Sequence, residues 1–264
     1  MRNFDYKKSL GQNFLIDNNI INKISESINP NKEDLIVEIG PGAGALTKKL
    51  VEKNCDVICF EIDTRLEEKL KSINANNLKV VFNDFLKVNL SEYIDLKKYN
   101  HVYFVGNLPY YITTAIINKI VEESNPYEII IMVQKEVGDR FASKPNSRDY
   151  SSISVFLQYN FDIEKVVKVG KHCFEPVPKV DSIVIKLKRN KKNSAIDEEL
   201  LYKFIKDSFR QKRKNLRNNL KEYNLKIIEE TLKKYNKDLT YRAESLTVDE
   251  FIEISNELAK SKQL

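Results

Sequence analysis

The sequence contains few of the residues that metal sites and disulfide frameworks require. Among its 264 residues there are three cysteines, Cys55, Cys59 and Cys173, and no two of them have Cys-x-x-Cys spacing. This set supports neither a disulfide framework nor a zinc knuckle. The chain has two histidines, His101 and His172, which argues against histidine-based metal or triad chemistry. We therefore expect no metal site.

Long apolar runs are also absent. The longest, such as 102–105 and 128–133, are far shorter than the roughly 20 residues that a membrane-spanning helix needs. The charged first ten residues lack the pattern of a signal peptide. We therefore expect a cytoplasmic protein without membrane contact. A hydrophobic content of 42% over this length allows one large domain with its own core and a small second domain.

The positive charge is concentrated in one segment. From Lys186 to Lys221 there are thirteen Lys and Arg against four Asp and Glu, a net +9 in a chain whose total is +6. Such clustering is typical of a surface that binds a polyanion, although a charged run is more commonly a solvated helical surface. If 199–222 is one helix, its basic residues lie on one side, whereas a break near Gln211 would disperse them. The candidate contacts to a polyanion within this segment are Arg210, Arg213, Lys214 and Arg217.

Apolar, β-branched segments alternate with segments of helical periodicity through the first two thirds of the chain. The strands expected there are 35–39, 57–60, 79–82, 102–105 and 129–133. The helices expected between and after them are 45–54, 66–73, 85–94, 113–123 and 135–142. This alternation predicts an α/β fold with a doubly wound, mainly parallel sheet.

The remaining third of the chain changes character. Segments 153–159, 163–169 and 182–187 have strand-like composition without long helices between them, which predicts that the sheet ends in antiparallel pairing. A polar stretch at 189–194 follows, and 196–264 has the pattern of helices throughout. We therefore expect two domains, a Rossmann-like domain over 1–189 and a small, basic, all-helical domain over 190–264.

Polar residues follow successive predicted strands, at the sheet edge where ligands of doubly wound folds bind. Glu61 follows the second strand, 21 residues beyond Gly40, at the spacing where a carboxylate accepts ribose hydroxyls. Asp84 follows the third strand and can accept a hydrogen bond from an adenine amino group, and Asn107 follows the fourth. Ordinary solvation of strand ends would explain either carboxylate alone, but the three together favour a nucleoside site.

A glycine-rich turn at 40–44 follows the first predicted strand. Its pattern is Gly-x-Gly-x-Gly, which lacks the third glycine of the dinucleotide fingerprint at its usual place. A turn of this kind is a weak signal by itself. The departure favours an adenosyl ligand without pyrophosphate, and we expect S-adenosylmethionine as the cofactor.

The chemistry of one four-residue run is suited to binding an amino group of a planar base. This run consists of Asn107, Leu108, Pro109 and Tyr110. The Asn107 oxygen and the Leu108 or Pro109 carbonyl can accept the two hydrogens of adenine N6, and alignment would supply most of the rate. Tyr110 would stack on a base that has left its helix. A strand-ending turn is the alternative for the isolated tetrapeptide, and its context favours methyl transfer. Phe174, in a proline-containing loop, could cover the other face of the base or could be buried packing.

Taken together, these motifs resemble the KsgA-type small-subunit (16S) ribosomal RNA adenine dimethyltransferases. The resemblance covers nearly the whole chain, with departures at Tyr111 and Ala115, where Asn and Pro are expected. The segments that carry it are 9–15 (SLGQNFL), 38–44 (EIGPGAG), 106–110 (GNLPY), 134–137 (QKEV), 178–182 (PKVDS) and 210–220 (RQKRKNLRNNL).

The resemblance implies transfer of four methyl groups from S-adenosylmethionine to N6 of two adjacent adenosines in the 3′-terminal stem-loop of 16S rRNA. The substrate would be an assembling small ribosomal subunit. From the sequence itself we expect a monomer. In the family's pattern, residues 107–110 hold the target base. The residues that would contact the cofactor are Asn13, Leu15, Gly40, Glu61, Asp84 and Asn107.

Two other functions remain open at this point. The erythromycin-resistance group similarly dimethylates an adenosine of large-subunit rRNA, and only the basic C-terminal domain and the 178–182 motif favour the small subunit. An assembly or transcription factor could retain the fold without catalysis. The intact Gly40, Glu61, Asp84 and Asn107 argue against that loss, although they leave open a second role as a checkpoint of subunit maturation.

Overall fold

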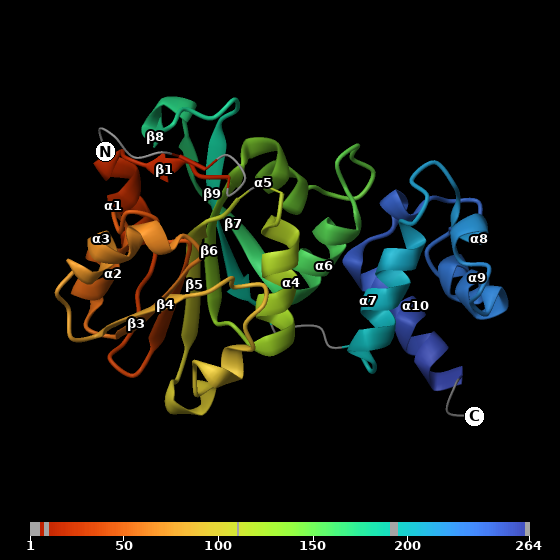
Figure 1. Cartoon of the computed structure of the whole chain (residues 1–264). Coiled ribbons are helices and arrows are strands. Elements are labelled where there is room, and N and C mark those ends of the chain that lie inside the picture. The colour runs from red at the N-terminus through yellow and green to blue at the C-terminus, as the bar shows by residue number, and fades with distance from the viewer. Residues whose placement is uncertain (1–5, 8–10, 110, 191–194, 262–264) are drawn as a thin grey trace. The chain divides into compact units, whose positions relative to one another are not determined.

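The computed structural model describes residues 6–7, 11–109, 111–190 and 195–261. It divides into two units, one of residues 1–138 and 164–188 and the other of residues 139–163 and 189–264 (Figure 1). Whether these units fold independently, with a domain boundary at 189 and 190, stays a prediction. Among the described helices, none is long and apolar enough to cross a membrane.

A seven-stranded sheet forms the centre of the first unit. Its strands, in spatial order, are β4 (Leu78–Phe82), β3 (Asp56–Glu61), β2 (Leu35–Ile39), β5 (Val102–Asn107), β6 (Glu128–Gln134), β9 (Ser182–Arg189) and β7 (Phe161–Val169). The five strands from β4 to β6 are mutually parallel, and β9 is antiparallel to β6. The five strands predicted from alternation and the antiparallel ending are confirmed.

The chain order of the strands reverses between β2 and β5, which places the ligand edge of the sheet there. All five residues of β2 are buried, as expected for a parallel strand covered on both faces. β5 approaches β2 so closely that a Cβ on Gly106 would lie 2.6 Å from the Ile39 carbonyl oxygen. The ends of β2 and β5 are therefore adjacent.

Helices cover both faces of this sheet, with α1 to α3 on one side and α4 and α5 on the other (Figure 1). The α-helices are α1 (Asn18–Glu26), α2 (Thr47–Leu50), α3 (Glu67–Lys71), α4 (Thr113–Glu123) and α5 (Lys135–Phe141). The 3-10 turns are η2 (Val51–Lys53), η3 (Thr64–Leu66), η4 (Leu90–Glu92), η5 (Leu96–Lys98) and η6 (Lys171–Cys173).

The helix predicted over 85–94 is wrong, because only η4 forms there. The Asp84 carboxylate accepts from the Leu86 N–H at 3.0 Å, and the Asn89 amide oxygen accepts from the Ser91 N–H at 3.2 Å. Short polar side chains that capture backbone donors in this way compete with helix formation.

A separate two-stranded sheet joins the N-terminal segment to a distant loop. β1 (Phe14–Leu15) pairs antiparallel with β8 (Phe174–Glu175), and the Ile16 N–H donates to the Cys173 carbonyl at 2.9 Å. Asp17 then caps α1 by accepting from Asn19 and Ile20. The segment before α1 is therefore fixed by contacts far along the chain.

The second unit is helical. Its α-helices are α6 (Ser152–Asn160), α7 (Glu198–Ser208), α8 (Leu216–Asn219), α9 (Leu225–Lys233) and α10 (Val248–Ser261), with the 3-10 turn η7 (Ala243–Ser245). Phe204 of α7 and Phe251 of α10 are fully buried and meet edge to face, with ring centroids 5.9 Å apart. The helical pattern predicted for the C-terminal region is confirmed over its described residues.

The strand predicted over 153–159 is wrong, because α6 occupies this segment. The Ser154 hydroxyl accepts from the Ser151 N–H at 3.2 Å, a hydrogen bond typical of a helix start. Val155 and Tyr159, four residues apart, enter the same core as Phe204. Helical spacing of the buried residues therefore overrides their β-branched and aromatic composition.

The single helix considered over 199–222 is also wrong. α7 ends at Ser208 and α8 begins at Leu216. The Asn219 amide donates to the carbonyls of Ser208 at 2.7 Å and Gln211 at 3.3 Å, and so closes a loop over 209–215. The basic residues are therefore dispersed over a loop and a short helix.

Candidate active site

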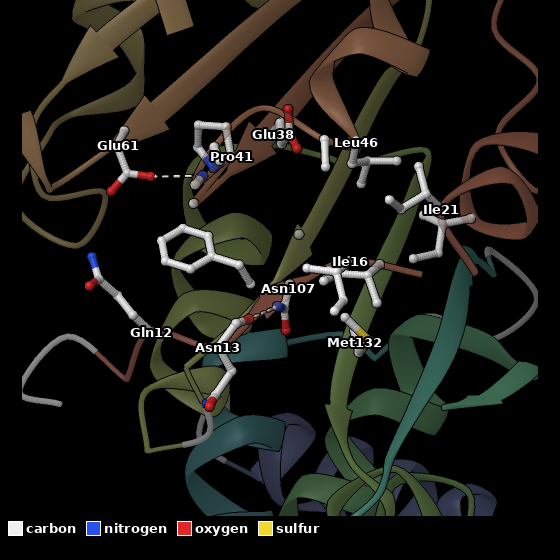
Figure 2. A pocket seen from close by; sticks show the side chains of 18 of the residues that line it. Gln12, Asn13, Ile16, Ile21, Glu38, Pro41, Leu46, Glu61, Asn107 and Met132 are labelled. Carbon is white, nitrogen blue, oxygen red and sulfur yellow. Dashed lines mark hydrogen bonds between the residues drawn. The ribbon is translucent and has the colours of Figure 1, made fainter. Parts of the chain in front are cut away.

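A cavity of about 300 Å³ lies at the carboxyl ends of β2, β3 and β5, beneath residues 11–16. Figure 2 shows the polar Gln12 and Glu61 at one end, Ile16 and Met132 at the other, and Asn107 between them. This size is at the lower end of the range for small-molecule sites. The predicted site residues that line it are Asn13, Leu15, Gly40, Glu61, Asn107 and Pro109.

The glycine-rich turn after β2 needs glycine for two different reasons. Gly40 and Gly42 have φ values of +70° and +58°, a region that side-chain-bearing residues rarely adopt. A Cβ on Gly40 would meet nothing within 4 Å, whereas one on Gly42 would lie 2.6 Å from the Phe14 ring. The missing side chain of Gly42 therefore makes room for the Phe14 ring, and the space beside Gly40 is open.

Glu61, the last residue of β3, has a buried carboxylate that fixes this turn. Its two oxygens accept from the N–H groups of Gly42 at 3.0 Å and Asp63 at 2.9 Å. Burial raises the pKa of Glu61, and the backbone donors oppose that rise. Because each carboxylate oxygen accepts more than one hydrogen bond, both retain capacity for hydroxyl groups of a ligand.

Gln12, which the sequence analysis did not select, ties the N-terminal segment to the loop after β3. Its amide donates to the Asp63 carboxylate at 2.7 Å, and Arg65 forms an ion pair with the same carboxylate at 2.6 Å. The hydrogen bonds from Arg65 lower the pKa of Asp63 to about 2. A contact across 51 positions leaves no local signal in the sequence.

Asn107, the last residue of β5, meets Asn13 in the cavity. Its amide nitrogen donates to the Asn13 backbone carbonyl at 2.8 Å, as Figure 2 shows. This hydrogen bond fixes the orientation of the amide plane. The Asn107 side-chain oxygen is then the group that can accept from a ligand.

The two residues after Asn107 differ in what they can offer. Leu108 is 1% exposed, and its N–H donates to the Met132 carbonyl at 3.3 Å. The Pro109 carbonyl accepts from the Ile112 N–H at 3.1 Å and the Thr113 hydroxyl at 3.3 Å. Pro109 lines the cavity and Leu108 does not, and which of the two carbonyls accepts from a ligand stays a prediction. Tyr110 lies outside the described residues.

Asp84 and Phe174 do not line this cavity. The Asp84 carboxylate is half-buried, and it lies 3.8 Å from the Lys87 ammonium; its contact with a cofactor stays a prediction. Phe174 is 1% exposed and shares a hydrophobic core with Ile20 and Val184. The structure thus favours the packing alternative for Phe174, because a ring that covers a base must be accessible.

The four predicted polyanion contacts belong to the second unit and are exposed. Arg210, Arg213 and Lys214 lie in the loop between α7 and α8, and Arg217 lies in α8. The Arg217 guanidinium is 3.5 Å from the Glu229 carboxylate. These positions are compatible with contact to a polyanion, which stays a prediction.

Glu38 is a second residue that the sequence analysis did not select as a site residue. It lines the cavity yet is 2% exposed. One carboxylate oxygen accepts from the Thr47 hydroxyl at 2.6 Å and the Cys59 thiol at 3.3 Å. Burial raises the pKa of Glu38 to about 7. A carboxylate inside an otherwise apolar predicted strand was the feature of the sequence that could have identified Glu38 as a site residue.

Comparison with known proteins agrees with this geometry. A family model described as ribosomal RNA adenine dimethylase matches residues 3–260. A Clostridioides difficile protein named ribosomal RNA small subunit methyltransferase A is 43% identical over 263 residues, which cover 96% of this chain and 91% of that protein. A Bacillus cytotoxicus protein of the same name is 40% identical over 272 residues, which cover 98% of this chain and 93% of that protein.

Two solved structures share the fold. A dimethyladenosine transferase from Plasmodium falciparum matches with a TM-score of 0.80 at 24% identity, over 94% of this chain and 98% of that one. The 23S rRNA methyltransferase ErmE matches with a TM-score of 0.71 at 27% identity, over 94% of this chain and 100% of that one. The predicted Rossmann-like methyltransferase fold and the predicted family are therefore confirmed. With a family match over residues 3–260 and relatives at 40% identity and above, the chain belongs to the ribosomal RNA adenine dimethylase family.

Proposed function

We propose that this protein transfers four methyl groups from S-adenosylmethionine to N6 of two adjacent adenosines in the 3′-terminal stem-loop of 16S rRNA, within an assembling small subunit. The observation that carries the proposal is the Asn107 amide, held by Asn13 at the edge of a cavity that Glu61 and Gly40 also line. The names of the curated relatives support the choice of the small subunit.

The cavity has the features that an adenosyl cofactor requires. Glu61 offers carboxylate oxygens for ribose hydroxyls, and the open space at Gly40 allows close approach to the backbone. Asn13 and Leu15 would contact the cofactor from the opposite wall. S-adenosylmethionine supplies a methyl group on a positively charged sulfur when it is bound.

The residues around Asn107 would orient the adenine amino group rather than deprotonate it. The N6 lone pair is delocalised into the ring, and so N6 is a poor nucleophile. When the Asn107 oxygen and the Leu108 or Pro109 carbonyl accept its two hydrogens, the nitrogen is drawn toward tetrahedral geometry and its lone pair faces the cavity. Because neither acceptor is a base, the displaced proton passes to water. Such preorganised acceptors act through alignment and electrostatics.

The same two acceptors would hold the base for the second transfer. A monomethylated N6 has one hydrogen left, and so it engages one acceptor at a time. The remaining hydrogen bond would keep the nitrogen at the cavity while the first methyl group takes the place of the lost hydrogen. Because the same two acceptors serve both transfers, dimethylation needs no second set of residues.

The experiment that tests the substrate is methyl transfer from labelled S-adenosylmethionine to unmethylated small subunits, large subunits and free rRNAs. We expect label in small-subunit rRNA alone. Label in the large subunit would select a resistance-type enzyme, and binding to the small subunit without transfer would select an assembly factor. Asn107→Ala should abolish the signal. Asn100→Ala, an exposed asparagine before the opposite end of β5, is the matched control and should retain it.

A further inference from the structure

A second cavity, of about 370 Å³, lies at the end of β6 in the first unit. Residues 134–136, Lys171 and residues 179–181 line it. The segments 134–137 and 178–182 are two of the motifs that carry the family resemblance, and the cofactor site uses neither. The structure brings these two motifs together around one cavity.

Asp181 holds the three segments of this cavity in place. Its backbone carbonyl accepts from the Lys135 N–H at 3.0 Å, at the start of α5. Its carboxylate accepts from the Lys171 N–H at 3.0 Å. One residue therefore fixes the backbones of two lysines that face the cavity from different segments, beside Lys179 from its own.

The side chains around the cavity favour an anion. Lys135, Lys171 and Lys179 contribute three ammonium groups, against the carboxylates of Glu136 and Asp181. All five residues are exposed. Within the described part of the chain, neither Lys171 nor Lys179 forms an ion pair, and the Asp181 carboxylate already accepts from the Lys171 N–H. These two ammonium groups are therefore available to an anionic ligand.

The cavity lies close to the transfer site. Met132 of β6 lines the first cavity and is the register partner of Asn107. Gln134, two residues further along β6, lines the second cavity. At a rise of about 3.3 Å per residue this separation is about 7 Å, so that the second cavity is within reach of the strand backbone next to a base held at Asn107.

We propose that the second cavity binds a phosphate of the RNA strand within one or two nucleotides of the target adenosine, through Lys171 and Lys179 with Lys135 beside them. This inference rests on the proposed function, because the ligand is the backbone of the same substrate. The site would hold the strand while the adenosine enters the first cavity, and it would be separate from the basic residues of the second unit.

The test compares Lys171→Ala/Lys179→Ala with Lys32→Ala/Lys98→Ala, a double variant that removes the same charge. Lys32 precedes β2 and Lys98 precedes β5, so that both lie at the opposite edge of the sheet, and both are exposed. Binding to unmethylated small subunits is measured at several salt concentrations. We expect Lys171→Ala/Lys179→Ala to weaken binding about tenfold, as for the loss of one charged hydrogen bond. The slope of log affinity against log salt should fall by about 0.7 to 0.9.

Three further readouts separate a phosphate site from a cavity that only supports the cofactor site. S-adenosylmethionine affinity by calorimetry should match that of the wild type, and Lys171→Arg/Lys179→Arg should restore most of the RNA affinity. A salt slope and affinity equal to those of the control variant would overturn the phosphate site while leaving the proposed function intact. Weaker cofactor binding would also overturn it, because the cavity would then support the first site. Failure of the proposed function itself would be seen in the wild type, as binding without methyl transfer.

Discussion

The buried Glu38 carboxyl should make the stability of this protein depend on pH, and Glu38→Gln should remove that dependence. Burial raises the pKa of Glu38 from 4.5 to about 7, and the neighbouring Glu61 contributes to the rise. A glutamine has the same shape, and its oxygen can still accept from the Thr47 hydroxyl. The substitution therefore removes the ionisation and changes the packing little.

The direction in which stability changes with pH follows from the higher pKa of Glu38 in the folded state. Between pH 4.5 and about 7 the folded protein holds a proton at Glu38 that the unfolded chain has released, and so stability falls as the pH rises through this window. A pKa difference of about 2.5 corresponds to about 3 kcal/mol. Relative to the wild type, Glu38→Gln should gain about 3 kcal/mol of unfolding free energy between about pH 4 and about pH 8.

The assay is urea unfolding of both proteins at pH values of about 4, 6 and 8, without ligand. The unfolding free energy of Glu38→Gln minus that of the wild type should increase with pH and level off above about pH 7. Altered hydrogen bonds would add an offset that does not change with pH. Thr47→Val, which removes the hydroxyl donor and keeps the carboxyl, should show the opposite trend, because it raises the pKa of Glu38 further. A difference that is constant with pH would refute the assignment of a neutral Glu38 to the folded state.

Three other predictions concern the site and the RNA surface. Asn107→Ala should lower methyl transfer by roughly 100-fold or more with S-adenosylmethionine affinity within a few-fold of wild type, and wild-type turnover would remove Asn107 from its role. Glu61→Gln should raise the dissociation constant for S-adenosylmethionine by roughly 10- to 100-fold, through one lost charged hydrogen bond, and an unchanged calorimetric titration would exclude that contact. Reversing the charge of Arg213, Lys214 and Arg217 to Glu should weaken subunit binding and flatten its salt dependence, whereas an unchanged slope would make this loop an ordinary solvated surface.

The sheet was predictable because its strands are buried and β-branched, and because their alternation with helices permits few topologies. The prediction for 153–159 was wrong because the same composition suits a buried helix, and the hydrogen bond between Ser151 and Ser154 that starts α6 was not recognised as a start signal. The long helix over 199–222 was wrong because the Asn219 amide closes a loop with hydrogen bonds that span eleven and eight positions. Both outcomes depend on contacts that composition does not encode.

In the candidate site, the residues that follow strands were predictable because topology alone brings strand ends together. Gly40, Glu61 and Asn107 all line one cavity for this reason. Asn13 was selected through the family resemblance only, and its hydrogen bond to Asn107 spans 94 positions. The Asp181 contacts that build the second cavity are equally invisible in the sequence, since its backbone carbonyl and its carboxylate accept from backbone N–H groups of two separate segments.

The most direct test of the central claim is the mass of the 3′-terminal fragment of small-subunit rRNA after reaction with the purified protein and S-adenosylmethionine. The account predicts four added methyl groups, carried as two adjacent N6,N6-dimethyladenosines, and none with Asn107→Ala. A fragment of unchanged mass from subunits that the protein demonstrably binds, or methyl groups on any other atom or nucleotide, would contradict it.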